Sequence, residues 1–212
     1  MNLEGDGSED LLRVMGPHLE QLQTSGEVQP SVMEEVLQMS GLRRLEVTCA
    51  EDEGYPDLPL GLEELYIDEI TENQLRCVER MPRLSSLEVN NYRGPNLTFP
   101  PSQHNRLVWL CVGFDTDHKS TILSLIRAHA SSVQELRVYC TLPPGDKNFY
   151  FPDLGQELAA CGLRALRRLV LERPTKSTAC QAAACLVQRR VIRSCLHPSV
   201  EVVCMACQTM QF

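Results

Sequence analysis

One hexapeptide recurs along this chain: an apolar residue, two variable residues, a second apolar residue, one variable residue and a third apolar residue. Successive copies begin between 20 and 34 residues apart. Spacing of this kind predicts that each repeat is one structural unit stacked on its neighbours. Six copies fit the pattern fully, at residues 42–47, 62–67, 84–89, 107–112, 133–138 and 166–171, and two weaker copies lie at residues 19–24 and 200–205.

The second and third apolar positions of the hexapeptide are two residues apart, so both side chains point to the same side of a short strand. We therefore expect an α/β fold: a solenoid whose parallel strands form a concave sheet, with helices on the convex side. No single repeat can bury its apolar side alone, whereas a stack buries these sides together. We expect a single domain over residues 11–207, between a flexible acidic segment at 1–10 and a tail at 208–212.

Two segments between the hexapeptides carry signals for the start of a helix. Ser31 and Glu34 have the spacing of a capping box directly after Pro30, and Thr71 and Gln74 have the same spacing. In a capping box the first side chain accepts from the backbone of the third helical residue, whose own side chain bonds back. We expect helices to begin at both places.

The remaining connections are predicted from apolar spacing and from proline. A helix is expected from Ser120, another after Asp153 as its cap, and a long one over residues 178–195. Pro100 and its neighbour Pro101 predict a connection without a regular helix. The segment 142–152, which is rich in proline and glycine, predicts an inserted loop.

Charge and composition exclude several classes of protein. Hydrophobic residues make up 43% of the chain, so it is not a disordered acidic tail. Residues 1–90 have a formal charge of -14 and residues 91–212 one of +6, which predicts two regions of opposite sign. No stretch has the roughly 18 apolar residues of a membrane span, and the acidic start of the chain lacks the apolar core of a signal peptide. We therefore expect a cytoplasmic or nuclear protein with ten reduced cysteines.

Over residues 11–207 the pattern resembles that of leucine-rich repeats. The longer pattern of that family places Asn or Cys three positions after the last apolar residue of the hexapeptide. Cys49 and Cys140 lie one position earlier. Asn and Cys are therefore missing from the family's position in this chain. In this respect, and in the irregular lengths of its repeats, the chain resembles the repeats of F-box proteins. The ladder positions here are occupied by Ala50, Ile70, Tyr92, Asp115, Thr141 and Pro174.

The resemblance implies a protein-binding function without catalysis. In F-box proteins the repeats capture a substrate, and the F-box docks the receptor onto the Skp1/cullin machinery of an SCF-type E3 ubiquitin ligase. Only 18 residues precede the first hexapeptide, and residues 11–15 are too short for an F-box. The sequence is then expected to be a fragment or relative without its F-box, or a free-standing repeat scaffold with no ligase link.

The variable positions of the strands are expected to form the partner-binding surface. Trp109, the one tryptophan, and Tyr66 are the expected hot spots, because aromatic side chains and Arg dominate binding energy at interfaces. The alternatives are that Trp109 packs on neighbouring residues and that the charges pair with one another. The expected contact set is Arg44, Glu46, Glu64, Tyr66, Glu88, Trp109, Cys111, Glu135, Arg137 and Arg168.

Toward the C-terminus this surface is expected to become apolar, with Val170, Val202 and Cys204 at variable positions. A surface of that kind is typical of a contact site. The alternative is that the tail at 208–212 folds over it.

Other chemistry finds little support in the sequence. The closest approach to a metal site is Cys195, His197, Cys204 and Cys207, because Cys-x-x-Cys is a zinc spacing. We expect Cys204 to point away from its neighbours, and Cys161, Cys180 and Cys185 to be small buried helix residues. The phosphate-binding and nucleophile motifs of common enzymes are missing, so we expect no enzyme, metal or cofactor.

Basic residues gather in the last third of the chain. Few aromatic residues lie among them, so nucleic-acid binding by base stacking is not expected. An acidic protein surface, including the N-terminal half of another copy, fits better. These residues are Arg164, Arg167, Arg168, Arg173, Lys176, Arg189, Arg190 and Arg193.

Overall fold

The computed structural model describes residues 8–50, 54–142, 147–173 and 182–208. The chain divides into two compact units, residues 1–95 and 96–212. Both units are α/β, with a parallel sheet whose strands follow the order of the sequence. Pro174, Lys176 and Cys180 lie outside the described residues, as do residues 1–7 of the expected segment 1–10 and residues 209–212 of the expected tail 208–212.

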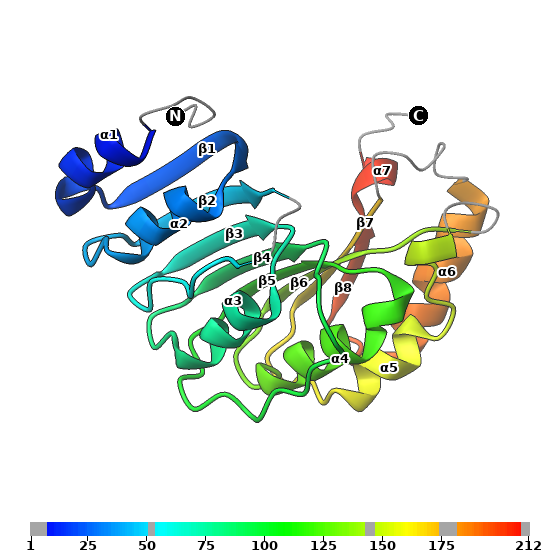
Figure 1. Cartoon of the computed structure of the whole chain (residues 1–212). Coiled ribbons are helices and arrows are strands. Elements are labelled where there is room, and N and C mark those ends of the chain that lie inside the picture. The colour runs from blue at the N-terminus through cyan, green and yellow to red at the C-terminus, as the bar shows by residue number, and fades with distance from the viewer. Residues whose placement is uncertain (1–7, 51–53, 143–146, 174–181, 209–212) are drawn as a thin grey trace. The chain divides into compact units, whose positions relative to one another are not determined.

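The first unit contains four parallel strands, each paired with the next in the sequence (Figure 1). Helices lie in two of the connections, and a further helix precedes the first strand. The elements are α1 (Ser8–Met15), the 3₁₀ turn η1 (Gly16–His18), β1 (Gln21–Val28), α2 (Pro30–Leu37), β2 (Arg44–Cys49), β3 (Glu64–Asp68), α3 (Glu72–Cys77), η2 (Val78–Arg80) and β4 (Ser86–Asn90).

The second unit repeats this arrangement and contains the two longest described helices, α4 and α6. Its four strands are again parallel and paired in order, and α5 packs against α6. The elements are β5 (Trp109–Gly113), η3 (Thr116–His118), α4 (Lys119–Ala128), β6 (Glu135–Tyr139), η4 (Lys147–Phe149), α5 (Leu154–Ala160), β7 (Arg168–Glu172), α6 (Ala182–Cys195), β8 (Glu201–Cys204) and α7 (Met205–Gln208).

The register of the strands confirms the interpretation of the six clear hexapeptides as strands with a shared interior. Leu45 pairs with Leu65, and Leu65 pairs with Leu87. In the second unit Leu110 pairs with Leu136, which pairs with Leu169. All six leucines are fully buried, and the apolar residues two positions after them are buried to 4% exposure or less. The equivalent positions therefore form continuous apolar rows inside each unit.

The frame predicted for the last copy is wrong by one residue. Leu169 pairs with Val202, so Val202 occupies a buried row and Cys204 occupies the next one. Glu201 and Val203 take the variable positions instead. The sequence has valine at 200, 202 and 203, so apolar residues fit both frames, and pairing with β7 selects between them.

One of the two predicted capping boxes is present. Gln74 accepts from the backbone N–H of Thr71 at the start of α3, as expected. The other is wrong, because α2 begins at Pro30 and the Ser31 hydroxyl donates to Glu9 on α1. Proline is well suited to the first helical position, where its missing N–H costs no hydrogen bond.

The other expected connections are largely confirmed. Helix α4 begins at Lys119, and α5 begins directly after Asp153, although its carboxylate pairs with Lys119 and does not cap the helix. Helix α6 begins at Ala182, and the expected start at 178–181 lies outside the described residues. Residues 97–108 contain no helix. Side chains of α4 hold this segment: Thr121 and Ser124 accept from the backbone N–H groups of Leu97 and Phe99.

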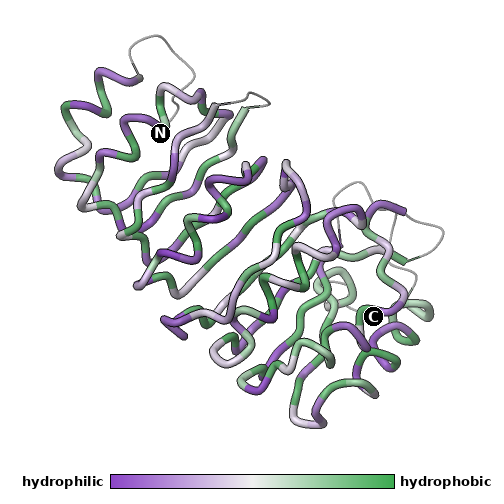
Figure 2. Tube along the Cα trace, turned by 60° about the horizontal axis from the view of Figure 1, so that its bottom comes forward, coloured by the Kyte–Doolittle hydropathy of each residue, from purple (hydrophilic) through white to green (hydrophobic). Residues whose placement is uncertain are grey.

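Helices α5 and α6 approach closely at Gly155. A Cβ atom at this position would lie 2.9 Å from the Ile192 Cα, so only glycine fits without a shift of the helices. Polar and apolar residues alternate along the helices (Figure 2), as expected for helices with one buried side. No described helix has both the length and the apolar character needed to cross a membrane.

Candidate functional site

In the first unit the third and fifth hexapeptide positions form two rows of half-buried side chains, which we call the first open face. Parallel pairing aligns Arg44 with Glu64 and Ser86, and Glu46 with Tyr66 and Glu88. Successive side chains of a strand alternate between its two sides, so these rows lie opposite the leucine rows. All five residues that we expected here as contacts therefore share one surface.

Arg44 and Tyr66 lie at the centre of the first open face. The Arg44 guanidinium lies 5.2 Å from the centre of the Tyr66 ring, a cation–π distance. It also forms ion pairs of 3.4 Å with Glu46 and with Glu64. Gln23 donates to the other Glu46 oxygen at 2.8 Å. The contact with Arg44 holds the phenol ring in place. The two ion pairs of Arg44 support the expected alternative, in which the charges pair with one another.

A hollow of about 260 Å³ lies beside Tyr66 on this face. Its lining contains three carboxylates, from Glu46, Asp68 and Glu88, and no Lys or Arg among the described residues. Asp68 accepts from the Asn91 side chain at 2.8 Å, which orients the carboxylate. The full lining is Thr24, Glu46, Val47, Thr48, Tyr66, Ile67, Asp68, Glu88 and Asn90. Asp68 and Asn90 were not predicted from the sequence. Each lies one residue after the hexapeptide of its repeat.

In the second unit, a network of side chains forms a surface that we call the second open face. Its members are Trp109, Glu135, Arg137, Arg168, Glu172 and Glu201. Glu135 Oε1 accepts from Trp109 Nε1 at 3.1 Å and from Arg137 Nε at 2.8 Å. The Arg137 guanidinium lies 5.4 Å from the centre of the Trp109 ring. Arg137 also pairs with Glu172, and Arg168 lies between Glu135 and Glu201. Trp109 is half-buried, so it both packs on its neighbours and keeps some exposed surface.

Four residues expected on this face, Cys111, Val170, Val202 and Cys204, are buried and offer no contact surface. Cys111 is 2% exposed. Its neighbour on the next strand is Arg137, whose longer side chain extends to the Trp109 ring. Val170 is fully buried, and the short helix α7 contacts its strand. Cys204 points into the interior because of the shifted frame. The expected apolar contact surface at the C-terminal end is therefore absent from the described residues.

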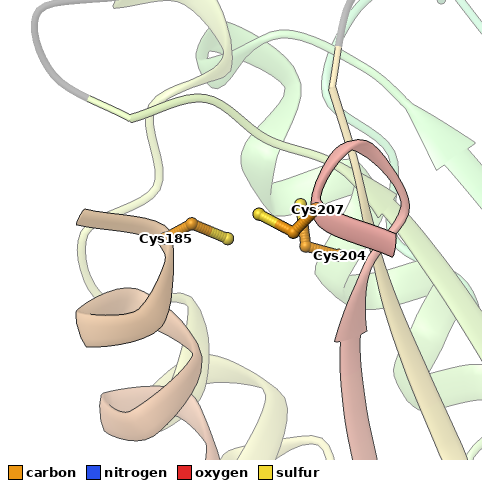
Figure 3. A group of neighbouring side chains, drawn as sticks. All are labelled: Cys185, Cys204 and Cys207. Carbon is orange, nitrogen blue, oxygen red and sulfur yellow. The ribbon is translucent and has the colours of Figure 1, made fainter. Parts of the chain in front are cut away.

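The structure separates the four residues of the expected metal candidate. Cys204 and Cys207 lie together, but the His197 ring bonds the Ser199 hydroxyl and the Cys195 thiol faces the Val191 carbonyl of its own helix. The third member of the cluster is Cys185, in the first turn of α6 (Figure 3). The sulfur atoms of Cys185, Cys204 and Cys207 all lie within 4.8 Å of one another. No local spacing in the sequence connects Cys185 with the other two.

Arg173 lies beside this thiol cluster. Its guanidinium donates to Cys185 Sγ at 3.4 Å, to Cys140 Sγ at 3.2 Å and to the Gln188 side chain at 2.9 Å. The pKa of Cys204 is lowered, because the Cys185 thiol donates a hydrogen bond to it and Arg173 adds positive charge. The same hydrogen bond raises the pKa of Cys185. The cluster therefore favours one thiolate, at Cys204.

The basic residues of the last third do not form one surface. Arg168 belongs to the second open face, and Arg173 to the thiol cluster. Arg189 and Arg193 both donate to the backbone carbonyl of Val202 on β8. These four members of the basic run therefore hold structure together at separate places, whereas Arg164, Arg167 and Arg190 are exposed.

No family model and no curated protein matches this chain. The two open faces and the thiol cluster thus have to be interpreted from their own chemistry. The first open face offers a hollow with negative charge and an aromatic ring, and the second a tryptophan held by a charge network.

Proposed function

We propose that this chain is a protein-interaction module that binds its partner through the open faces of its sheets. The observation that carries the proposal is the hollow beside Tyr66, whose lining combines three carboxylates with an aromatic ring. Aligned variable side chains on a rigid sheet are typical of binding surfaces in repeat proteins. For the fold we propose a leucine-rich-repeat horseshoe, which the repeat pattern and the sequential parallel strands support.

The charge of the hollow supports a partner of basic character. Glu46, Asp68 and Glu88 attract positive charge, and Arg44, which pairs with Glu46 and lies over the Tyr66 ring, shows that a guanidinium fits beside these groups. Residues 1–90 carry a formal charge of -14, which draws a basic partner toward this unit. The first open face is therefore suited to a Lys- or Arg-rich segment of another protein.

Binding of synthetic peptides tests this assignment. A fluorescent Lys/Arg-rich peptide should bind the full chain at low salt, and a matched Asp/Glu-rich peptide should not. The double variant Glu46→Gln/Glu88→Gln should weaken binding of the basic peptide by about tenfold or more, since charge pairs set encounter and register at such surfaces. The control is Glu63→Gln, which removes an equally acidic side chain outside the hollow. Equal affinity of both peptides, or an equal effect of the control, would reject the site.

The second open face is proposed as a further contact surface, with Trp109 as its anchor. Tyr66→Ala and Trp109→Ala should each weaken capture of a protein partner from a cell extract without unfolding the chain. Circular dichroism serves as the folding control. Capture that neither substitution changes would exclude both faces.

The resemblance to F-box proteins supports one specific partner system as a proposal: substrate recognition or an adaptor role in an SCF-type ubiquitin ligase. The alternative is a scaffold without any ligase link. Affinity purification of the chain as it is expressed in cells distinguishes them, because the ligase role requires Skp1 and cullin subunits in the purified material. Purification of other partners without these subunits would favour the scaffold.

A further inference from the structure

We propose that Cys185, Cys204 and Cys207 form a binding site for a thiophilic metal ion, Zn²⁺. This inference is independent of the protein-binding function, because the thiol cluster and the open faces share no residue. The three sulfur atoms come from three elements, α6, β8 and α7, and all lie within 4.8 Å of one another (Figure 3).

The separations of the sulfur atoms suit a zinc ion. Zinc–thiolate bonds of about 2.3 Å place tetrahedral sulfur ligands about 3.8 Å apart. The three thiols would have to close by about 1 Å at most from their present separations to reach this geometry. Cys207 is half-buried and Cys185 and Cys204 are buried, so the ion would enter from the side of Cys207.

Arg173 balances the charge of such a site. Zinc with three thiolates carries a formal charge of −1, and the guanidinium next to Cys185 supplies the opposite charge. In the described part of the chain Arg173 forms no ion pair with a carboxylate. Its Nη atoms donate to thiols, to the Cys140 carbonyl and to Gln188, and its Nε is buried without a hydrogen-bond partner. A partly buried cation surrounded by thiols is better stabilised when those thiols are ionised.

The bond changes are simple. Each thiol that binds as a thiolate gives up its proton to water, and its sulfur donates an electron pair to the ion. Three protein ligands leave the fourth tetrahedral position to a water molecule on the open side of Cys207. The ion would join α6 to the end of β8, and therefore stabilise the C-terminal repeat.

Metal titration of the full chain tests the proposal. The protein is stripped of metal and kept reduced with a phosphine, which presents no competing thiol. Co²⁺, a spectroscopic substitute for Zn²⁺, should then produce the near-ultraviolet band of thiolate-to-cobalt charge transfer at one ion per chain. Zn²⁺ should remove the band by displacement, and should raise the melting temperature.

Single substitutions locate the ion. Cys207→Ala should weaken binding more than about tenfold, since loss of even a group that only supports a ligand has that effect. Because Cys207 is half-buried, this variant should keep its fold. The matched controls are Cys161→Ala, a buried thiol of the same unit outside the cluster, and Cys195→Ala; both should bind as wild type does. Absence of the charge-transfer band, binding that Cys207→Ala leaves unchanged, or an intact mass two hydrogens short from a Cys204–Cys207 disulfide under phosphine would each overturn the proposal.

Discussion

The indole N–H of Trp109 and the N–H at Arg137 Nε share one acceptor, Glu135 Oε1, at 3.1 and 2.8 Å. The Arg137 guanidinium also covers the indole ring. A single carboxylate thus fixes both the orientation of Trp109 and the cation above it. Any partner that binds Trp109 meets a ring that is already held in position, and so loses less side-chain entropy on binding.

Glu135→Ala should release Trp109 from this position. The tryptophan emission should shift to the red, and because Trp109 is the only tryptophan the signal has no other source. The free energy of unfolding should fall by about 1 kcal/mol, the upper range for partly exposed ion pairs. Glu201→Ala is the control, since this more exposed residue contacts the network only through Arg168. An unchanged spectrum of the first variant would mean that Glu135 does not hold the ring.

Leu110→Ala should lower the free energy of unfolding far more than Val108→Ala, although the two residues are only two positions apart. Leu110 is fully buried and pairs with Leu136, so its truncation should cost about 2–5 kcal/mol of unfolding free energy. Val108 is 41% exposed, and its truncation should cost well under about 1 kcal/mol. Urea unfolding measures both. Similar losses for the two variants would contradict the strand frame of this repeat.

Substitution of the two predicted capping residues should separate the correct prediction from the wrong one. Thr71→Ala removes a cap of α3 and should destabilise the chain by about 1 kcal/mol. Ser31→Ala removes only an exposed bond to Glu9 and should change stability by less than about 0.5 kcal/mol. Thermal unfolding of the two variants, side by side, gives the comparison. A larger loss for Ser31→Ala would restore the capping box at α2.

The pH dependence of stability should contain a contribution from His129. Burial lowers the pKa of this imidazole to about 4, with a smaller effect of His104. The unfolded chain takes up the proton near pH 6.5 and the folded chain only near pH 4, so stability is complete above pH 6.5 and falls as the pH is lowered between these values. From pH 7.5 to 5.0 the loss should be about 2 kcal/mol. Urea unfolding of His129→Gln at pH 7.5 and at pH 5.0 should lack this loss of about 2 kcal/mol. If the variant loses as much stability as the wild type, another group is responsible for the pH dependence.

Gly155→Ala should disturb the contact between α5 and α6. The new Cβ would lie 2.9 Å from the Ile192 Cα and 3.2 Å from Cys195 Sγ, so the helices would have to separate. Overpacking of this kind costs about 1–3 kcal/mol. Gly41→Ala is the control, because its Cβ would meet only ordinary contacts of 3.7 Å or more. Urea unfolding measures the stability of both variants. Equal losses for the two substitutions would show that α5 and α6 can move apart without cost.

The rows of buried leucines were predictable because apolar residues recur at positions that only one strand frame satisfies. Leu45, Leu65 and Leu87 have charged or polar neighbours on both sides, so a slip of one residue would bury charge. The last copy lacks this protection, since Val200, Val202 and Val203 satisfy two frames equally well. Tertiary pairing with β7 decides there, and the sequence has no local signal for it.

The candidate sites were predictable only in part. The contact residues of the first open face follow from the strand frame, but the depth of a side chain such as Cys111 depends on larger neighbours from other strands. Cys185 lies 19 residues before Cys204, on a different element, and joins the thiol cluster through packing of α6 on β8. Spacing along the chain therefore selected Cys195 and His197, which are closer in sequence but turn elsewhere.

The two guanidinium groups on the Val202 carbonyl have a consequence for the behaviour of the chain at high concentration. β8 is the last strand of its unit, and terminal strands invite edge-to-edge polymerisation because their backbone groups can template a further strand. An incoming strand would have to displace Arg189 and Arg193 from that oxygen and bring its own backbone against two fixed positive charges. Among the described residues, helix α6 thus occupies one backbone acceptor of β8 that an incoming strand would need.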